Sequence, residues 1–392
     1  TGGSTTWDCD ITGYALPGQT ITLTVGVADL EDNQQGTYNP DGSQMLGDPS
    51  WASFYAHHNV GGILRDVSLL ALPKDYIARV YTGTDFDENF INADLEVTAQ
   101  LGMVSSNATL QIELIDKEGQ TVAEESMDFS GRENGADELS ALLEEAGRLL
   151  EENKENTFPE GEEGGNGQYP QQAYDALKEA YDQAAQALGQ LQSQLSDAKK
   201  VVIPIKKPDQ WDAEHPNLYT LKTSLLVDGK LQQVNTEKIG FREIHYGGRD
   251  GSDVNKVYVN GKEVKLRGTC RHDVSYDLGR SISKEKAWEE IRAYKEANIN
   301  FIRTSHYPAS EEILDACDEL GIYVEQENAA CFQGANDNAI QCPPEDFVNE
   351  FTEMIERDRN RASILIWSLG NESGFEATTA FRTEFDYVKS VD

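Results

Sequence analysis

Positive charge is scarce in this sequence of 392 residues. The 33 lysines and arginines stand against 69 aspartates and glutamates, which gives a formal net charge of −36. Such a chain offers little counter-charge to phosphates, so the sequence argues against nucleic-acid binding. It also lacks any apolar run near the roughly 20 residues needed to cross a bilayer, so we expect no membrane span. The five cysteines are an odd number without a C-x-x-C pair, which argues against a zinc site and against a closed disulfide framework.

The rest of the composition is that of a globular protein, with 38% hydrophobic and 26% charged residues. At roughly 100–200 residues per domain, the length predicts two to four domains. The sequence begins at Thr1 without an initiator methionine and stops at Asp392 inside a helical pattern. We therefore expect an internal piece of a longer protein.

Residues 11–130 alternate between apolar and polar positions, as half-buried strands do. The alternation is clear at residues 21–27 and 110–115, and it predicts all-β sandwich modules. Strand patterning returns at residues 201–205 and 218–221. We therefore expect one sandwich from about Tyr76 to Ile244, interrupted by an insertion.

The insertion is acidic and has a helical pattern. Residues 131–165 contain 11 acidic and 3 basic side chains, as a solvated helix face or a linker does. Beyond them, two rows of residues recur every seven positions, namely Tyr174, Tyr181, Leu188 and Leu195, and Leu177, Ala184, Leu191 and Ala198. This spacing predicts two paired antiparallel helices. The segment resembles the FIVAR helical repeats of extracellular proteins in Gram-positive bacteria, which slightly favours an extracellular or cell-surface location.

From residue 257 onward the sequence predicts a hairpin and then four strand–helix units. The hairpin, residues 257–266, has Asn260-Gly261 at its tight turn. The expected strands are Val264–Gly268, Asn300–Thr304, Ile322–Glu327 and Ser363–Leu369, and the expected helices are Lys284–Asn298, Glu311–Leu320, Glu345–Asn360 and Ala377–Lys389. Four consecutive units imply a parallel sheet, which would be half of an eight-unit barrel.

Polar side chains gather where each expected strand ends, which is where such barrels carry their active sites. They are Arg271, His272 and Asp273, then Arg303, Ser305, His306 and Tyr307, then Glu325 and Glu327, and finally Asn371, Glu372 and Ser373. Glu372 follows the apolar run 364–367. Burial at the mouth of that strand would favour its protonated form and suit a general acid. The alternative is an exposed loop glutamate.

Three ordered motifs resemble the signature segments of glycoside hydrolase family two, nearest its β-galactosidases. They are Arg267–Asp273, Arg303–Pro308 and Ile366–Ser373. Upstream, residues 61–67 resemble the end of that family's sugar-binding jelly roll, and residues 239–242 resemble the exit from its immunoglobulin-like domain.

The resemblance implies a multidomain protein of β-sandwiches followed by the first half of a (β/α)8 TIM barrel, with an inserted helical hairpin. Residues 1–73 would be the C-terminal part of the jelly roll, and residues 74–130 with 201–246 the immunoglobulin-like sandwich. Residues 131–200 would be the helical insertion, and residues 247–392 the N-terminal half of the barrel.

The resemblance also implies roles for six residues. Glu372 takes the position of the acid/base, and Asn371 that of the hydrogen-bond partner to the sugar 2-hydroxyl. His272 and His306 match histidines that contact the sugar, although each could be a buried histidine satisfied by a carbonyl group. Arg303 matches an arginine that orients the nucleophilic carboxylate, or it could be a core ion-pair partner. Asp48 lies where the jelly roll would send a loop toward the sugar.

The sequence departs from the family's pattern at two points, and each limits which properties of the family we expect of this chain. The family's magnesium ligands align with Cys331 and Gln333, a thiol and an amide, whereas magnesium prefers hard oxygen ligands, so no cofactor is expected. A retaining enzyme also needs a second carboxylate about 5–5.5 Å from the acid/base, on a later strand of the barrel. Glu325 and Glu327 are the nearest carboxylates, but they lie on the neighbouring strand. Neither is assigned as the nucleophile, and the chain alone should be inactive.

Three functions remain open. The first is a retaining β-galactosidase that acts on an oligo- or polysaccharide, and the second is a β-glucuronidase of the same family. The third is a non-catalytic carbohydrate-binding or adhesion protein that reuses the sandwiches. If the matched side chains converge on one place, the enzyme is favoured.

Overall fold

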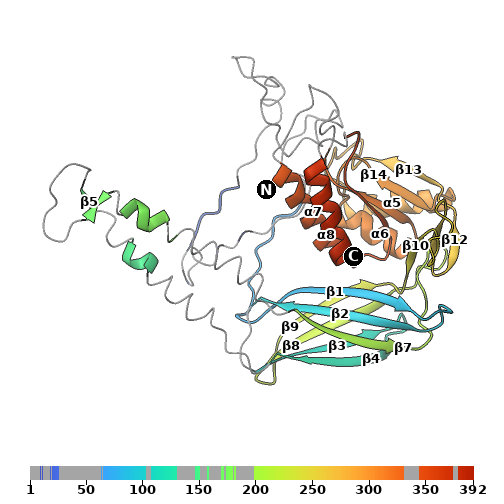
Figure 1. The fold of residues 1–392 in the computed structure, drawn as a ribbon, viewed down its shortest axis with the longest axis horizontal. Coiled ribbons are helices and arrows are strands. Elements are labelled where there is room, and N and C mark those ends of the chain that lie inside the picture. Colours follow the sequence, from blue (N-terminus) through green and yellow to red (C-terminus); the bar gives the residue numbers. More distant parts are fainter. Residues whose placement is uncertain are drawn as a thin grey trace, which may run out of the picture.

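The structure is a computed structural model, and it describes residues 65–102, 107–129, 198–330, 344–373 and 378–392. It also describes short pieces before residue 64 and between residues 146 and 181. Two units dominate these residues, an antiparallel β-sandwich and a unit of parallel strands covered by helices (Figure 1). No helix among the described residues is long and apolar enough to cross a membrane.

The sandwich consists of two antiparallel sheets. One sheet has the order β1-β2-β7, and the other has the order β4-β3-β8-β9. Their strands are β1 (Ile77–Phe86), β2 (Ala93–Leu101), β3 (Ala108–Ile115), β4 (Thr121–Asp128), β7 (Lys199–Ile205), β8 (Tyr219–Val227) and β9 (Lys230–Ile239). Alternate residues of β2, including Leu95 and Val97, are buried in the shared core. β7 pairs with β2 and β8 pairs with β3, so the strands before residue 130 and those after residue 198 form one sandwich, as expected.

Several of the predictions for residues upstream of β7 fall largely outside the described residues. Within the expected insertion, β5 (Thr157–Phe158) and β6 (Tyr169–Pro170) pair in parallel, and half of the heptad positions, Ala184, Leu188, Leu191 and Leu195, lie outside the described residues. Most of residues 1–64, including Asp48, lie outside them as well. The strand expected at residues 21–27 is wrong for its described part. Residues 21–25 belong to no strand, since no described segment pairs with them.

A three-stranded hairpin layer links the two units. Its strands are β10 (Ile244–Tyr246), β11 (Val257–Val259) and β12 (Lys262–Val264), all antiparallel. Asn260 and Gly261, at the turn between β11 and β12, have φ angles of 50° and 72°. Two successive left-handed residues are what the tight Asn-Gly turn requires, so the expected hairpin is confirmed.

The second unit alternates strands and helices, and its four strands lie parallel in the order β13-β14-β15-β16. Its elements are β13 (Gly268–Arg271), α5 (Lys284–Glu296), β14 (Phe301–Thr304), α6 (Glu311–Leu320), β15 (Tyr323–Glu327), α7 (Pro344–Asp358), β16 (Ile364–Ser368) and α8 (Thr378–Val391). The side chain of Ser283 caps α5, and Gly321 ends α6 in the left-handed region. Apolar residues of α5 and α6 pack on the sheet.

The first parallel strand was placed too early by the sequence. Val264 ends β12, and the parallel strand begins only at Gly268. Val264 and Leu266 instead pack on a separate apolar cluster around Trp211 and Tyr323. Their hydrophobicity therefore reflects the contact between the two units rather than the sheet.

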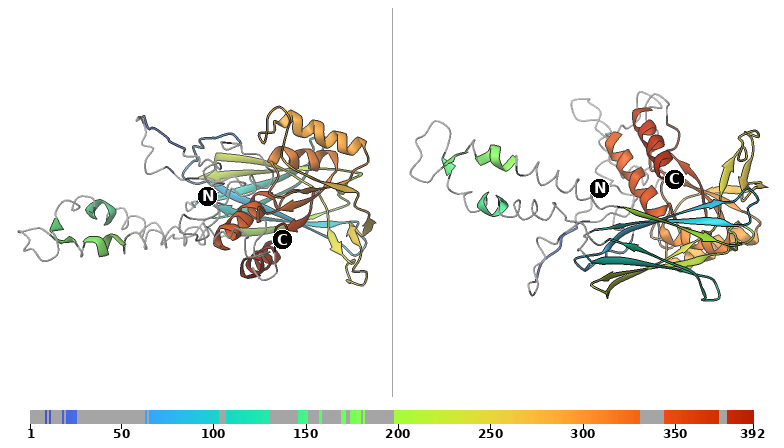
Figure 2. Two further views of the ribbon diagram at one scale, coloured as in Figure 1. Left: turned by 90° about the horizontal axis from the view of Figure 1, so that it is seen from above. Right: turned by 60° about the horizontal axis from the view of Figure 1, so that its bottom comes forward.

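The sandwich lies against the parallel unit (Figure 2), and polar side chains join the two. Trp211 donates its indole N–H to the carbonyl oxygen of Asp318, at 2.8 Å. Asn360, which follows α7, accepts from the backbone of Thr82 at 2.9 Å and donates to the carbonyl of Val80 at 2.7 Å. These contacts fix the sandwich against the helices of the parallel unit.

Candidate active site

The carboxyl ends of the four parallel strands bring one set of polar side chains to the same edge of the sheet. Arg303 lies on β14 and Glu327 ends β15, while His306 and Asn371 follow β14 and β16. Because the strands are parallel and neighbouring, their last residues and the loops behind them meet. The structure therefore brings together Arg303, His306 and Asn371, three of the six residues selected from the sequence.

Glu327 is the centre of this cluster, and its side chain is fully buried. Its two carboxylate oxygens accept from Nε and Nη2 of Arg303 at 2.7 and 2.8 Å. Ser368 donates its hydroxyl to Oε2 at 2.8 Å. Burial alone would lower the pKa of Arg303, but the hydrogen bonds and charge of Glu327 outweigh it, so this pKa is raised. The guanidinium therefore stays charged and is held by both oxygens.

His306 is held by the same carboxylate. Its Nδ1 lies 2.9 Å from Oε1 of Glu327 and 3.2 Å from Nη2 of Arg303. A carboxylate can only accept and a guanidinium can only donate, so one N–H on Nδ1 satisfies the shorter contact. We therefore place a ring proton on Nδ1.

Asn371 is buried, and its two amide atoms differ in their bonding. Its Oδ1 accepts from Nη2 of Arg303 at 2.9 Å, and its backbone N–H donates to the carbonyl of Ala330 at 2.8 Å. Its Nδ2 is buried and has no hydrogen-bond partner within the described part of the chain. A buried donor without a partner costs free energy, so this nitrogen is an exception among buried polar groups.

Glu372 does not have the buried surroundings expected of it. Its side chain is exposed, so the expectation that burial shields this carboxyl from water is wrong for the structure. Glu372 lies four residues beyond the end of β16, and burial there depends on what folds over the strand mouth. Its φ of 46° is in the left-handed region, which is uncommon for a residue with a side chain and is found at functional sites.

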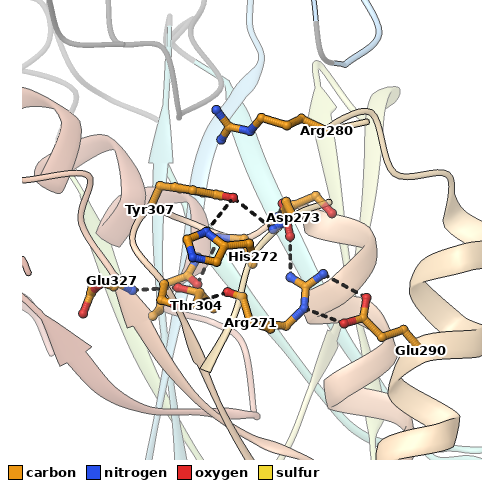
Figure 3. A network of polar contacts seen from close by, with 12 residues as sticks. Arg271, His272, Asp273, Arg280, Glu290, Thr304, Tyr307 and Glu327 are labelled. Carbon is orange, nitrogen blue, oxygen red and sulfur yellow. Dashed lines mark hydrogen bonds and ion pairs between the residues drawn. The ribbon is translucent and has the colours of Figure 1, made fainter. Parts of the chain in front are cut away.

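His272 follows β13 and lies beside the cluster. Its ring meets that of His306 edge to face, with 5.4 Å between the ring centroids. Its Nδ1 lies 3.3 Å from the hydroxyl of Tyr307, which also accepts from the backbone N–H of Asp273 at 3.0 Å (Figure 3). The structure thus brings His272 to the same edge as His306, and Tyr307 holds it there.

A buried charge network supports the loop that carries His272. Arg271 contacts Asp273 on one side and binds Glu290 of α5 through two hydrogen bonds of 3.0 and 2.9 Å (Figure 3). Arg65 reaches the other side of Asp273, with 3.0 Å between Nη2 and Oδ2. Burial would raise the pKa of Asp273, but the charges of Arg271 and Arg65 outweigh it, so this pKa is lowered. Residue 65 is thereby tied to the strand mouth of the parallel sheet.

Asp48, Cys331 and Gln333 lie outside the described residues. Among the described residues there is no cluster of three or more histidine, cysteine, aspartate or glutamate side chains that could hold a metal ion. Cys270, which was not selected from the sequence, points its sulfur toward Nη1 of Arg303 at 3.9 Å.

Comparison with known proteins agrees with this combination of sandwich and parallel unit. The model described as glycosyl hydrolases family 2, TIM barrel domain, matches residues 252–392. A second model, described as glycosyl hydrolases family 2, matches residues 159–242, which include β7 to β9. Together the two matches span more than half of the chain. They define a protein in which a sandwich precedes a TIM-barrel domain, and the chain belongs to glycosyl hydrolase family 2.

Individual proteins that are similar to this chain agree with the family assignment. A β-galactosidase of Clostridium acetobutylicum is 31% identical over 341 residues, which are 83% of this chain and 30% of that protein. A putative β-glucuronidase of Formosa agariphila is 39% identical over 168 residues, 43% of this chain and 19% of that protein. The structure of a family 2 member from Bacteroides cellulosilyticus matches the fold with a TM-score of 0.58 and 21% identity, over 82% of this chain and 36% of that one. The chain thus spans less than a third of the curated relatives it matches.

Proposed function

We propose that this chain supplies the acid/base half of a retaining β-glycosidase, most closely a β-galactosidase. The observation that supports this most is the unpartnered Nδ2 of Asn371, held beside the charged Arg303. A sugar hydroxyl placed at this nitrogen would satisfy a donor that is otherwise buried and unpaired. Such a contact to the 2-hydroxyl strengthens toward the oxocarbenium-like transition state.

Glu372 would act as the acid/base, since it is joined directly to Asn371. In the first step its carboxyl would protonate the glycosidic oxygen, and in the second its carboxylate would activate water. His306 and His272 would contact the sugar at the same edge. Arg303, fixed by Glu327, would orient the nucleophilic carboxylate.

The nucleophile would come from residues outside this chain. Glu327 is unsuitable because both of its oxygens are occupied by Arg303. Glu325 lies on β15, next to β16 rather than across a barrel from it. We therefore propose that the four parallel strands are the first half of an eight-stranded barrel, that an inserted helical hairpin lies within residues 131–198, before β7, and that the chain alone is inactive.

We infer the substrate class by analogy with the relatives. Ser368-Leu369-Gly370 before Asn371 favours a galactosidase, and β-glucuronidase is the alternative within the family. Cys331 and Gln333, which align with the family's magnesium ligands, offer sulfur and amide groups rather than carboxylates. This donor set does not suit magnesium, so no step of the proposed reaction passes through a metal.

The test measures hydrolysis of aryl galactosides and glucuronides by the protein that carries this chain together with the remaining barrel strands. Glu372→Gln is compared with Glu319→Gln, which removes an exposed carboxyl from α6. Loss of a general acid should slow the cleavage of substrates with poor leaving groups by about 10²–10⁴-fold. Substrates with very good leaving groups should lose much less glycosylation rate, because they need no protonation.

Equal losses for both kinds of leaving group would contradict the role of Glu372. A protein that binds sugars without cleaving any aryl glycoside would instead support the carbohydrate-binding alternative. The exposed side chain of Glu372 would fit that alternative.

A further inference from the structure

Two carboxyl groups are buried behind the candidate site, on the helices that follow β15 and β16. Glu384 on α8 is 0% exposed and Glu350 on α7 is 2% exposed. The two helices pack side by side (Figure 1). Buried carboxyls are rare unless they are paired with a positive charge or hydrogen-bonded, so this arrangement calls for a physical account.

Glu384 makes one polar contact to the loop behind the site. Its Oε1 accepts from Nδ2 of Asn328 at 3.2 Å, while its Oε2 is buried without a hydrogen-bond partner among the described residues. Asn328 directly follows Glu327, and its backbone N–H donates to the carbonyl of Ser368 at 2.9 Å. The carboxyl of Glu384 therefore binds the side chain of Asn328, the residue that directly follows the central carboxylate Glu327.

Residues 328–330 also support Asn371. The carbonyl of Ala330 accepts the backbone N–H of Asn371, and a side chain at Gly370 would overlap that carbonyl oxygen. Phe381, on the same helix as Glu384, packs on Ala330. The position of Asn371 thus depends on residues 328–330, and these depend on α8.

We propose that Glu384 is a positioning residue of the candidate site, whose buried carboxyl fixes Asn328 and, through residues 328–330, the backbone of Asn371. The proposal rests on the proposed function for the meaning of that site. It assigns Glu384 no contact with the sugar.

Burial also determines the protonation state of this carboxyl. Burial raises the pKa of Glu384 to about 9, the negative charge of Glu350 adds to the effect, and the hydrogen bond from Asn328 opposes it. Glu350 is the one charged group acting on it from the described residues. At neutral pH the carboxyl is thus protonated, so its burial leaves no negative charge on this group. Above pH 9 a second negative charge would appear beside Glu350 and loosen the contact of α8 with residues 328–330.

The direction in which pH changes the stability follows from the linkage between proton binding and folding. The folded-state pKa lies above that of an unfolded glutamate, so the stabilisation is fully present below about pH 4.5 and is lost as pH rises through 9. Glu384→Gln keeps an acceptor for Asn328 and removes the titration. Glu384→Leu removes both the acceptor for Asn328 and the titrating group. Asp386→Asn, on an exposed position of the same helix, is the matched control.

The experiment records thermal unfolding from pH 6 to pH 10 for the four proteins, and the side-chain amide resonance of Asn328 by NMR. The melting temperatures of wild type and Asp386→Asn should fall together toward pH 9, whereas that of Glu384→Gln should change much less. Glu384→Leu should shift the Asn328 resonance, and Glu384→Gln should preserve it. Parallel pH profiles of the melting temperature for wild type and Glu384→Gln would overturn the proposal. Magnesium or calcium that raised the melting temperature at pH 7 would also overturn it, because a cation would then occupy the carboxyls.

Kinetics separates this proposal from the proposed function. In the protein with the complete barrel, Glu384→Leu should raise KM or lower kcat for aryl glycosides, and Glu384→Gln should restore the wild-type values at pH 7. If the wild type cleaves no glycoside, the proposed function fails, while the pH profiles and the Asn328 resonance still decide whether Glu384 holds the loop. If the enzyme is active and Glu384→Leu leaves its kinetics unchanged, the positioning role is wrong.

Discussion

Replacing Glu327 by glutamine tests whether this carboxylate holds the site together. Its side chain is fully buried, and it accepts four hydrogen bonds, two from Arg303 and one each from His306 and Ser368. Glutamine keeps the shape but removes the charge, and it turns one acceptor into a donor that faces other donors. Arg303 would then be left charged without its partner.

The magnitude follows from the burial of both groups. Breaking a buried ion pair by removing one partner costs about 3–5 kcal/mol, because the other charge stays uncompensated. Arg303 keeps 24% of its side chain exposed, so water would offset part of this cost. We therefore expect Glu327→Gln to lower the free energy of unfolding by about 3 kcal/mol, the lower end of that range.

Glu325→Gln is the matched control, since it lies on the same strand and the same side of Arg303. Its carboxyl is 3.9 Å from Arg303 rather than 2.7 Å. Burial raises its pKa, so its charge is already disfavoured. We expect this change to cost less than about 1 kcal/mol.

Urea denaturation followed by tryptophan fluorescence measures both variants, because Trp288 and Trp367 pack against the core of the parallel unit. If Glu325→Gln cost as much as Glu327→Gln, the account of Glu327 as the central anchor would be refuted.

Two further predictions concern the contacts that join distant segments. Gly321→Ala should destabilise the chain by clearly more than the about 1 kcal/mol that a left-handed alanine costs, because its Cβ would overlap the carbonyl of Ala213. Gly229→Ala, at a φ of 72° with nothing within 4 Å, should cost only that strain, and urea unfolding compares the two. Arg65→Ala and Asp273→Asn should show a coupling energy of about 1 kcal/mol in a double-mutant cycle, since Arg65 is partly exposed. Strict additivity would mean that this ion pair contributes nothing.

The strand–helix order was predictable because each element carries its own local signal. The helix at Glu311–Leu320 was predicted with the bounds that the structure has, since Gly321 marks its end. β13 was placed too early because Gly268–Arg271 has almost no apolar pattern. Gly268 lies so close to the carbonyl of Phe301 that a side chain there would overlap it, and sequence pattern does not reveal such a contact.

The candidate site was predictable in its composition but not in its organisation. The motifs placed Arg303, His306 and Asn371 at strand ends, and parallel strands bring such ends together. The roles of Glu327 as the shared anchor and of Glu384 as a buried support depend on contacts with residues far away in the sequence. These contacts join residues that are 21 to 56 positions apart. The exposure of Glu372 likewise depends on what covers the strand mouth, which no local pattern encodes.

The most direct test of the account is a crystal structure of the protein with a glycoside-mimicking inhibitor bound. The account predicts that the 2-hydroxyl of the inhibitor accepts a hydrogen bond from Nδ2 of Asn371, with the Glu372 carboxyl beside the position of the glycosidic oxygen. An inhibitor bound only on the β-sandwich, or a Glu372 carboxyl directed away from the bound sugar, would contradict it.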